Sequence, residues 1–222
     1  MEDAAISGIS PVRNTSKSRE VFQKLRSAIL SGELQPGTPL KEAHIARQLS
    51  VSQVPVREAL LQLEHLGLVI RIPDKGTYVT KLTRAEMLQL IEVRCHLEDL
   101  AFRLAAKRMK PEIEASLRAR LAKLQERIQA RDHLGVAEAD LQFHEAVWDA
   151  AGNAVLKKTL ERLCVSVYAF VGLQRHAQGE KFATVSHEIL LEALLSGDAR
   201  LISKRIKEHL NPDSMIPSSV AD

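Results

Sequence analysis

Cysteine and aromatic residues are scarce in this sequence. Its 222 residues include only two cysteines, Cys95 and Cys164, and their spacing fits neither a zinc site nor a redox motif. We therefore expect free thiols in a reducing compartment instead of a disulfide framework. Aromatic residues amount to 4%, so a core must be built mainly from Leu, Ile, Val and Ala. With only 10 glycines and 8 prolines, this composition favours helices over a β-sandwich or a β-barrel.

Long hydrophobic runs and a strong charge imbalance are missing too. No stretch approaches the ~18 apolar residues of a membrane-spanning helix, and residues 1–15 lack the apolar segment of a signal peptide. The predicted location is therefore the cytoplasm, and no membrane partner is expected. The net charge of +3 does not by itself indicate nucleic-acid binding. Residues 12–62, however, hold eight Lys or Arg and four Asp or Glu, a local excess of +4.

The patterning divides the chain into four segments. Residues 1–15 are small and polar and are expected to form a disordered arm. Residues 16–82 combine helices with one β-hairpin, residues 83–210 are helical throughout, and residues 211–222 are expected to form a flexible tail. The predicted fold class is mainly α. It joins an N-terminal unit of three helices plus a hairpin to a C-terminal all-α antiparallel helical bundle.

Turn residues and apolar periodicity set the expected elements. Ser52 is a suitable helix N-cap, and residues 83–86 form a capping box. Two strand-like runs, residues 68–72 and 77–80, flank a turn at residues 73–76 and predict a hairpin. The helices are predicted over residues 17–31, 41–49, 53–66, 84–108, 111–130, 133–150, 154–175, 182–196 and 198–210.

This order of elements in the first 82 residues is typical of a winged helix-turn-helix. The N-terminal end of a recognition helix enters the major groove, so it needs short polar or basic side chains, and its N–H groups can bind a phosphate. The hairpin tip can reach an adjacent phosphate or the minor groove. Helix-turn-helix patterns also occur in proteins that bind no DNA, so the pattern alone leaves both interpretations open. The candidate DNA-binding residues are Arg47, Ser52, Gln53, Arg57, Lys75 and Gly76.

A second group of candidates lies in the helical segment. Asp140 and His144 are four residues apart, which puts both on one face of a helix. His187 and His209 lie on two later helices. Three imidazoles and a carboxylate can converge in a bundle core and bind a divalent transition metal. The chain has 8 histidines, so a chance grouping is the alternative on spacing alone.

The N-terminal segment resembles the GntR family of bacterial transcription regulators. The matching stretches are residues 28–37, 51–60, 67–69 and 75–79. The resemblance implies a homodimer that binds a pseudo-palindromic double-stranded DNA operator. That family usually has Arg in place of Ala43 and Arg-Thr in place of Gln53-Val54. Because Gln pairs with adenine whereas Arg favours guanine, we expect an operator that differs from the family's commonest one.

The helical segment resembles the FCD effector domain, the C-terminal domain of one GntR subfamily. The matching stretches are residues 140–147, 152–153, 187–194 and 209–210. The resemblance implies a divalent metal such as Zn, Ni, Mn or Fe, with a small organic-acid, sugar-acid or amino-acid effector at its open coordination positions. The implied metal ligands are Asp140, His144, His187 and His209.

Two further residues are candidate effector contacts. Arg94 lies in a stretch similar to the family's first effector-domain helix, and its guanidinium would clamp a carboxylate. The alternative is an i, i+4 pair with Glu98. Asn153 is the second candidate, and its alternative is a role at a helix break.

The function predicted from these features is a ligand-responsive transcription regulator, most simply a repressor. One alternative is a regulator whose metal is purely structural. Another is a metal-dependent hydrolase, because an open metal site can activate water. A hydrolase would leave the DNA-binding unit unexplained. The sequence also offers no convincing general base, because Glu145 and Glu188 are adjacent to candidate ligands in sequence and therefore point away from the ligand face of their helices. We therefore predict that the chain is not an enzyme.

Overall fold

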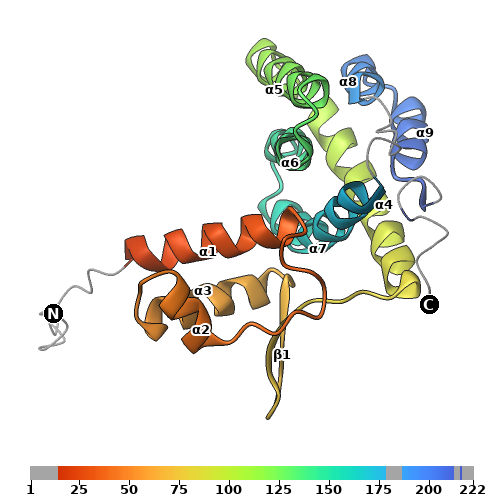
Figure 1. Ribbon diagram of the computed structural model, residues 1–222. Coiled ribbons are helices and arrows are strands. Elements are labelled where there is room, and N and C mark those ends of the chain that lie inside the picture. Colours follow the sequence, from red (N-terminus) through yellow and green to blue (C-terminus); the bar gives the residue numbers. More distant parts are fainter. Residues whose placement is uncertain (1–14, 179–186, 213–215, 217–222) are drawn as a thin grey trace, which may run out of the picture.

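The computed structural model describes residues 15–178, 187–212 and 216, and it is mainly helical (Figure 1). Most of the expected arm and tail, and the start of the helix predicted over 182–196, lie outside the described residues. Among the described residues, no helix is both long and apolar enough to cross a membrane. The helices in chain order are α1 Thr15–Leu30, α2 Glu42–Gln48, α3 Gln53–His65, α4 Arg84–Ala106, α5 Pro111–Gln129, α6 His133–Ala150, α7 Ala154–Gln178, α8 His187–Ser196 and α9 Ala199–His209.

Three helices and a hairpin form the N-terminal unit, as predicted. Val21, Leu25 and Ile29 recur at helical spacing on α1 and are buried against α3. Strands β1 Val69–Ile72 and β2 Gly76–Val79 pair antiparallel, with Val69 opposite Val79. The hairpin extends away from the helices (Figure 1). The unit therefore has the order and shape of a winged helix-turn-helix.

The prediction that Ser52 is the N-cap residue of α3 is confirmed, although its side chain makes no capping hydrogen bond. Ser52 occupies the N-cap position with extended backbone angles. An N-cap hydroxyl usually accepts from the N–H of the third helical residue. In α3 that residue is Pro55, which has no N–H to donate. The Ser52 hydroxyl therefore stays exposed at the start of the helix.

In the part of the chain described from Arg84 onward, six helices form the C-terminal unit. The predicted capping box opens α4, because the Thr83 side chain accepts from the Glu86 amide and the Glu86 side chain accepts from the Thr83 amide. Helix α4 buries an apolar face that is interrupted by Arg94 and Glu98. Phe102, Phe143 and Ile206 share one core with residues of α5, α7 and α8. This core surrounds the part of α4 that carries the two buried charges.

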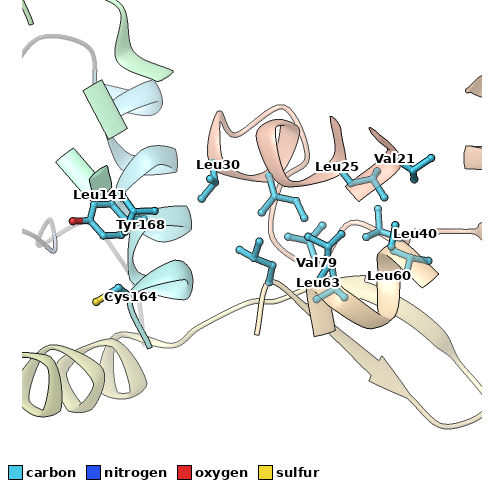
Figure 2. Packing of buried hydrophobic residues seen from close by; sticks show 14 of the residues in the cluster. Val21, Leu25, Leu30, Leu40, Leu60, Leu63, Val79, Leu141, Cys164 and Tyr168 are labelled. Carbon is cyan, nitrogen blue, oxygen red and sulfur yellow. The ribbon is translucent and has the colours of Figure 1, made fainter. Parts of the chain in front are cut away.

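The two units share apolar packing. One buried cluster contains Leu30 of α1 together with Leu141 of α6 and Cys164 and Tyr168 of α7 (Figure 2). The Ser166 hydroxyl of α7 also donates to the carbonyl oxygen of Gly67 over 3.2 Å. Gly67 lies between the end of α3 and the start of β1. Helix α7 is therefore in direct contact with the connection between the third helix and the hairpin.

The two cysteines are free thiols, as expected. Cys95 is partly buried and Cys164 is buried. Burial raises the pKa of Cys164 to about 12, so this thiol stays protonated and behaves as a small apolar side chain.

Candidate metal centre and DNA-binding surface

The structure brings together the four residues predicted as metal ligands. Asp140 and His144 lie one turn apart on α6, His187 is the first residue of α8, and His209 is the last residue of α9. One ligand atom from each residue lies within 4.8 Å of the others. Nε2 of His187 is 2.8 Å from Oδ1 of Asp140, and Nε2 of His144 is 3.3 Å from Nε2 of His209. We call this group the quartet.

Apolar packing fixes the quartet from several sides. The Phe143 ring meets the rings of His144 and His187 edge-on, with centroid separations of 5.8 Å and 5.2 Å. On α9, Ile202 and Ile206 are buried and share a helical face with His209. Burying these apolar neighbours therefore forces the histidines into one small volume in the interior.

The chemistry of the quartet fits a divalent transition metal. Burial, together with the neighbouring His187 and His144, lowers the pKa of His209 well below its usual range, so this imidazole is neutral. Neutral imidazole is the form that binds metals. Among the described residues, the buried Nε2 of His187 has no hydrogen-bond partner of acceptable geometry, despite its proximity to Asp140. Nitrogen and carboxylate ligands of this kind suit Zn, Ni, Mn and Fe.

A second set of buried polar side chains lies beside the quartet. Oε1 of Glu98 is 3.1 Å from Nδ1 of His144, and Oε2 accepts from the indole Nε1 of Trp148 over 2.9 Å. Burial alone would raise the pKa of Glu98, but His144, Arg94 and Trp148 together lower it. The Glu98 side chain is fully buried and ionised.

The two effector candidates occupy different surroundings. Arg94 is buried, and its guanidinium bonds Glu98 over 3.4 Å and the Tyr168 hydroxyl over 3.1 Å. The Arg94–Glu98 pair named as the alternative is therefore present, in the interior and beside the quartet. Asn153 is exposed, and its side chain accepts from the Leu156 amide at the start of α7. The structure does not bring Asn153 to the quartet, and it gives this residue the capping role named as its alternative.

The two glutamates next to ligands in sequence point elsewhere. The Glu188 side chain contacts Gln125 of α5. Glu145 is partly buried, and the charges that act on it come from Arg26, Lys157 and other groups outside the quartet. Neither glutamate is placed as a general base at the quartet.

The predicted DNA-binding residues are exposed on the N-terminal unit. Ser52 and Gln53 lie at the start of α3, and Lys75 and Gly76 lie at the hairpin tip. Arg47 is exposed near the end of α2. These side chains are therefore accessible to a DNA duplex.

Arg57 of α3 is paired within the unit. Its Nε and Nη2 donate to Oε2 of Glu42 over 3.1 Å and 2.9 Å. This hydrogen bond and the charge of Glu42 raise the pKa of Arg57. Because the fork of Arg57 is held by Glu42 at the first residue of α2, the two helices present it in a fixed orientation.

Glu42 and Tyr168 were not predicted as members of these sites, and Glu98 was predicted only as a partner of Arg94. The available signal was in α4, where two opposite charges four residues apart interrupt a buried apolar face. A charged pair on such a face needs polar partners from another helix. Which helix supplies them depends on tertiary packing, so Tyr168 could not be assigned from its own neighbours in sequence.

Comparison with known protein families decides the identity of the fold. The model of the FCD domain matches residues 89–212, and that of the gntR family of bacterial regulatory proteins matches residues 17–79. The chain belongs to the GntR family. It is a DNA-binding transcriptional regulator and not an enzyme.

Individual GntR-family relatives agree over nearly the whole chain. The chain is 31% identical over 196 residues to the "Probable D-xylose utilization operon transcriptional repressor" of Paenarthrobacter nicotinovorans, a match that covers 88% of this chain and 86% of that protein. It is 28% identical over 218 residues to the "HTH-type transcriptional repressor GlaR" of Escherichia coli, covering 93% and 99%. The solved structure of Escherichia coli McbR/YncC matches with a TM-score of 0.72 and 25% identity, covering 88% of this chain and 93% of that one.

Proposed function

We propose that this GntR-family regulator is a cytoplasmic homodimeric repressor whose helical domain binds a divalent metal and a small organic-acid effector. The observation that carries the proposal is the quartet of Asp140, His144, His187 and half-buried His209, whose ligand atoms lie within 4.8 Å of one another. A metal at the quartet would supply positive charge and open coordination positions. The proposed domains are residues 16–82 for DNA binding and residues 83–210 for sensing.

The charges around the quartet favour an anionic effector. The buried charged side chains here are one guanidinium, Arg94, and two carboxyl groups, Glu98 and Asp140. A divalent cation would add two positive charges to this group, in which Arg94 already offsets one carboxylate. A carboxylate is therefore favoured at the metal-loaded quartet. The positive charge of buried Arg94 also favours an anion near the quartet. Asn153 is not included in the proposed effector site.

The DNA-binding half of the proposal rests on α3. One chain presents one recognition helix, whereas a pseudo-palindromic operator offers two half-sites about one helical turn apart. A dimer presents two such helices. In this arrangement Ser52, Gln53 and Arg57 contact the major groove, while Arg47, Lys75 and Gly76 contact the backbone or the adjacent groove.

The proposal is tested by thermal unfolding with and without metal. The purified protein is screened against small organic acids, sugar acids and amino acids, both metal-loaded and after stripping with a chelator. We expect at least one acid to raise the unfolding temperature of the loaded protein only, because a ligand of the native state stabilises it by mass action. If stripping lowers the stability strongly and no acid has any effect, the metal is structural and the effector proposal is wrong.

The Ser166–Gly67 hydrogen bond provides a route from sensor to DNA-binding unit. We expect Ser166→Ala to reduce the change in operator affinity that an acid from this screen produces. A hydrogen bond contributes ~1 kcal/mol, which corresponds to a reduction of up to roughly fivefold. Operator affinity is measured by fluorescence anisotropy with and without the acid.

The matched control for this variant is Thr80→Ala. The Thr80 hydroxyl donates to the same Gly67 carbonyl over 2.7 Å but belongs to the DNA-binding unit itself. We expect Thr80→Ala to lower stability and to leave the response to the acid intact. An unchanged response in Ser166→Ala would exclude this contact from signal transmission.

A further inference from the structure

Glu98 lies at the centre of a buried polar group that adjoins the quartet. One carboxylate oxygen faces Nδ1 of His144 at 3.1 Å and Nη2 of Arg94 at 3.4 Å. The other accepts the indole hydrogen of Trp148 over 2.9 Å. Glu98 lies on α4, which carries no proposed metal ligand. Its contacts with His144 and Trp148 connect α4 to α6, the helix that carries two of the proposed ligands.

Tyr168 extends the same group to the second ligand on α6. Its hydroxyl oxygen accepts from Nη2 of Arg94 over 3.1 Å. A side-chain hydrogen bond also joins the Tyr168 hydroxyl to the Asp140 carboxylate. Arg94 therefore bridges two side chains, each of which contacts one residue of the quartet.

We propose that Glu98 and Tyr168 are positioning residues of the metal centre. Glu98 holds His144 with Nδ1 protonated and Nε2 directed at the other ligands, and Tyr168 orients the Asp140 carboxylate. This inference rests on the proposed metal site. In this proposal the Arg94–Glu98 pair helps to orient the metal ligands, in addition to stabilising α4.

The position of the His144 ring supports this assignment. An imidazole has two nitrogens, and Nε2 of His144 already lies 3.3 Å from Nε2 of His209 within the quartet. Nδ1 is thus the nitrogen beside the anion, 3.1 Å from it but not aligned for a hydrogen bond. A carboxylate at the outer nitrogen fixes the tautomer and increases the basicity of the inner one, which strengthens metal binding.

Glu98→Gln is the first test, because it keeps the shape of the side chain and removes its charge. We expect the affinity for Zn or Co, measured by competition with a chromophoric chelator, to fall ~10–100-fold. The absorption spectrum of the Co-loaded protein should also change, which a purely structural role would not require. Glu92→Gln is the matched control, since Glu92 is exposed on the same helix, and it should match the unaltered protein. An affinity of Glu98→Gln within threefold of the unaltered protein would overturn the assignment.

Two measurements keep the inference testable if Glu98→Gln fails to fold. Tyr168→Phe leaves every charge in place and should weaken metal binding as well. In the unaltered metal-loaded protein, nitrogen NMR of labelled histidine should find His144 protonated at Nδ1. A His144 ring bound to metal through Nδ1, or full affinity in Tyr168→Phe, would contradict the proposed positioning.

Failure of the underlying metal site gives a different result. If the unaltered protein itself binds none of Zn, Co, Ni, Mn and Fe, the proposed function is wrong, and the positioning role is wrong with it. If the unaltered protein binds metal and Glu98→Gln and Tyr168→Phe bind it equally well, only the positioning role is wrong.

Discussion

Replacing His187 by alanine is expected to lower metal affinity by ~100–1,000-fold. Zn sites with four protein ligands have apparent binding free energies of ~10–16 kcal/mol. Divided over the ligands, this corresponds to ~2.5–4 kcal/mol for each, or two to three powers of ten in affinity. His187 suits this test because it begins α8, and its Nε2 lies 2.8 Å from Asp140 within the quartet.

The measurement is metal content after dialysis, followed by chelator competition. His96→Ala is the control, because His96 is an exposed histidine of α4. His187→Ala should keep its DNA-binding unit folded and lose the metal-dependent response to organic acids, whereas His96→Ala should keep both. Full metal occupancy in His187→Ala would remove this residue from the site.

Arg57→Ala is expected to weaken operator binding by ~1–3 kcal/mol, or roughly 5–150-fold, if its guanidinium contacts a base. The structure adds a reason, because Glu42 holds the Arg57 fork through two nitrogens. A side chain held in this way loses less conformational freedom when it meets DNA. Arg57→Lys keeps the charge without the fork, so it should restore only part of the affinity.

Titrations at fixed salt with a labelled operator measure this effect. Arg118→Ala is a matched control, since Arg118 is an exposed arginine of α5 that pairs with Glu114. If Arg57→Ala binds the operator as tightly as Arg118→Ala, Arg57 makes no important contact with DNA.

The sequence predicted elements that depend on local signals. Helix boundaries followed from apolar spacing, from the capping box at Thr83 and from the proline at the start of α5. The winged unit was predicted correctly because its hairpin turn and the ends of its helices depend on residues that are neighbours in sequence. Ser52 was predicted correctly as the N-cap of α3, but its side chain makes no capping bond, because the third helical residue, Pro55, has no amide hydrogen.

Contacts between distant segments were harder to predict. Asp140 and His144 share a helix face by spacing alone, but joining them to His187 and His209 needed the family resemblance. Besides Arg94, Glu98 contacts His144 and Trp148, which are 46 and 50 residues away in sequence. Such contacts depend on how α4 packs against α6, and no periodic pattern in either helix encodes that packing.

The shared cluster between α1 and α7 limits how freely this winged unit can be exchanged between regulators. Leu30 of α1 belongs to one buried cluster with residues of α7, and α1 packs against α7. A chimera that joined this winged unit to the helical domain of a different regulator would leave that apolar surface without its matching face. During evolution, the residues on the two sides of this junction must therefore change together, even though each side performs a separate task.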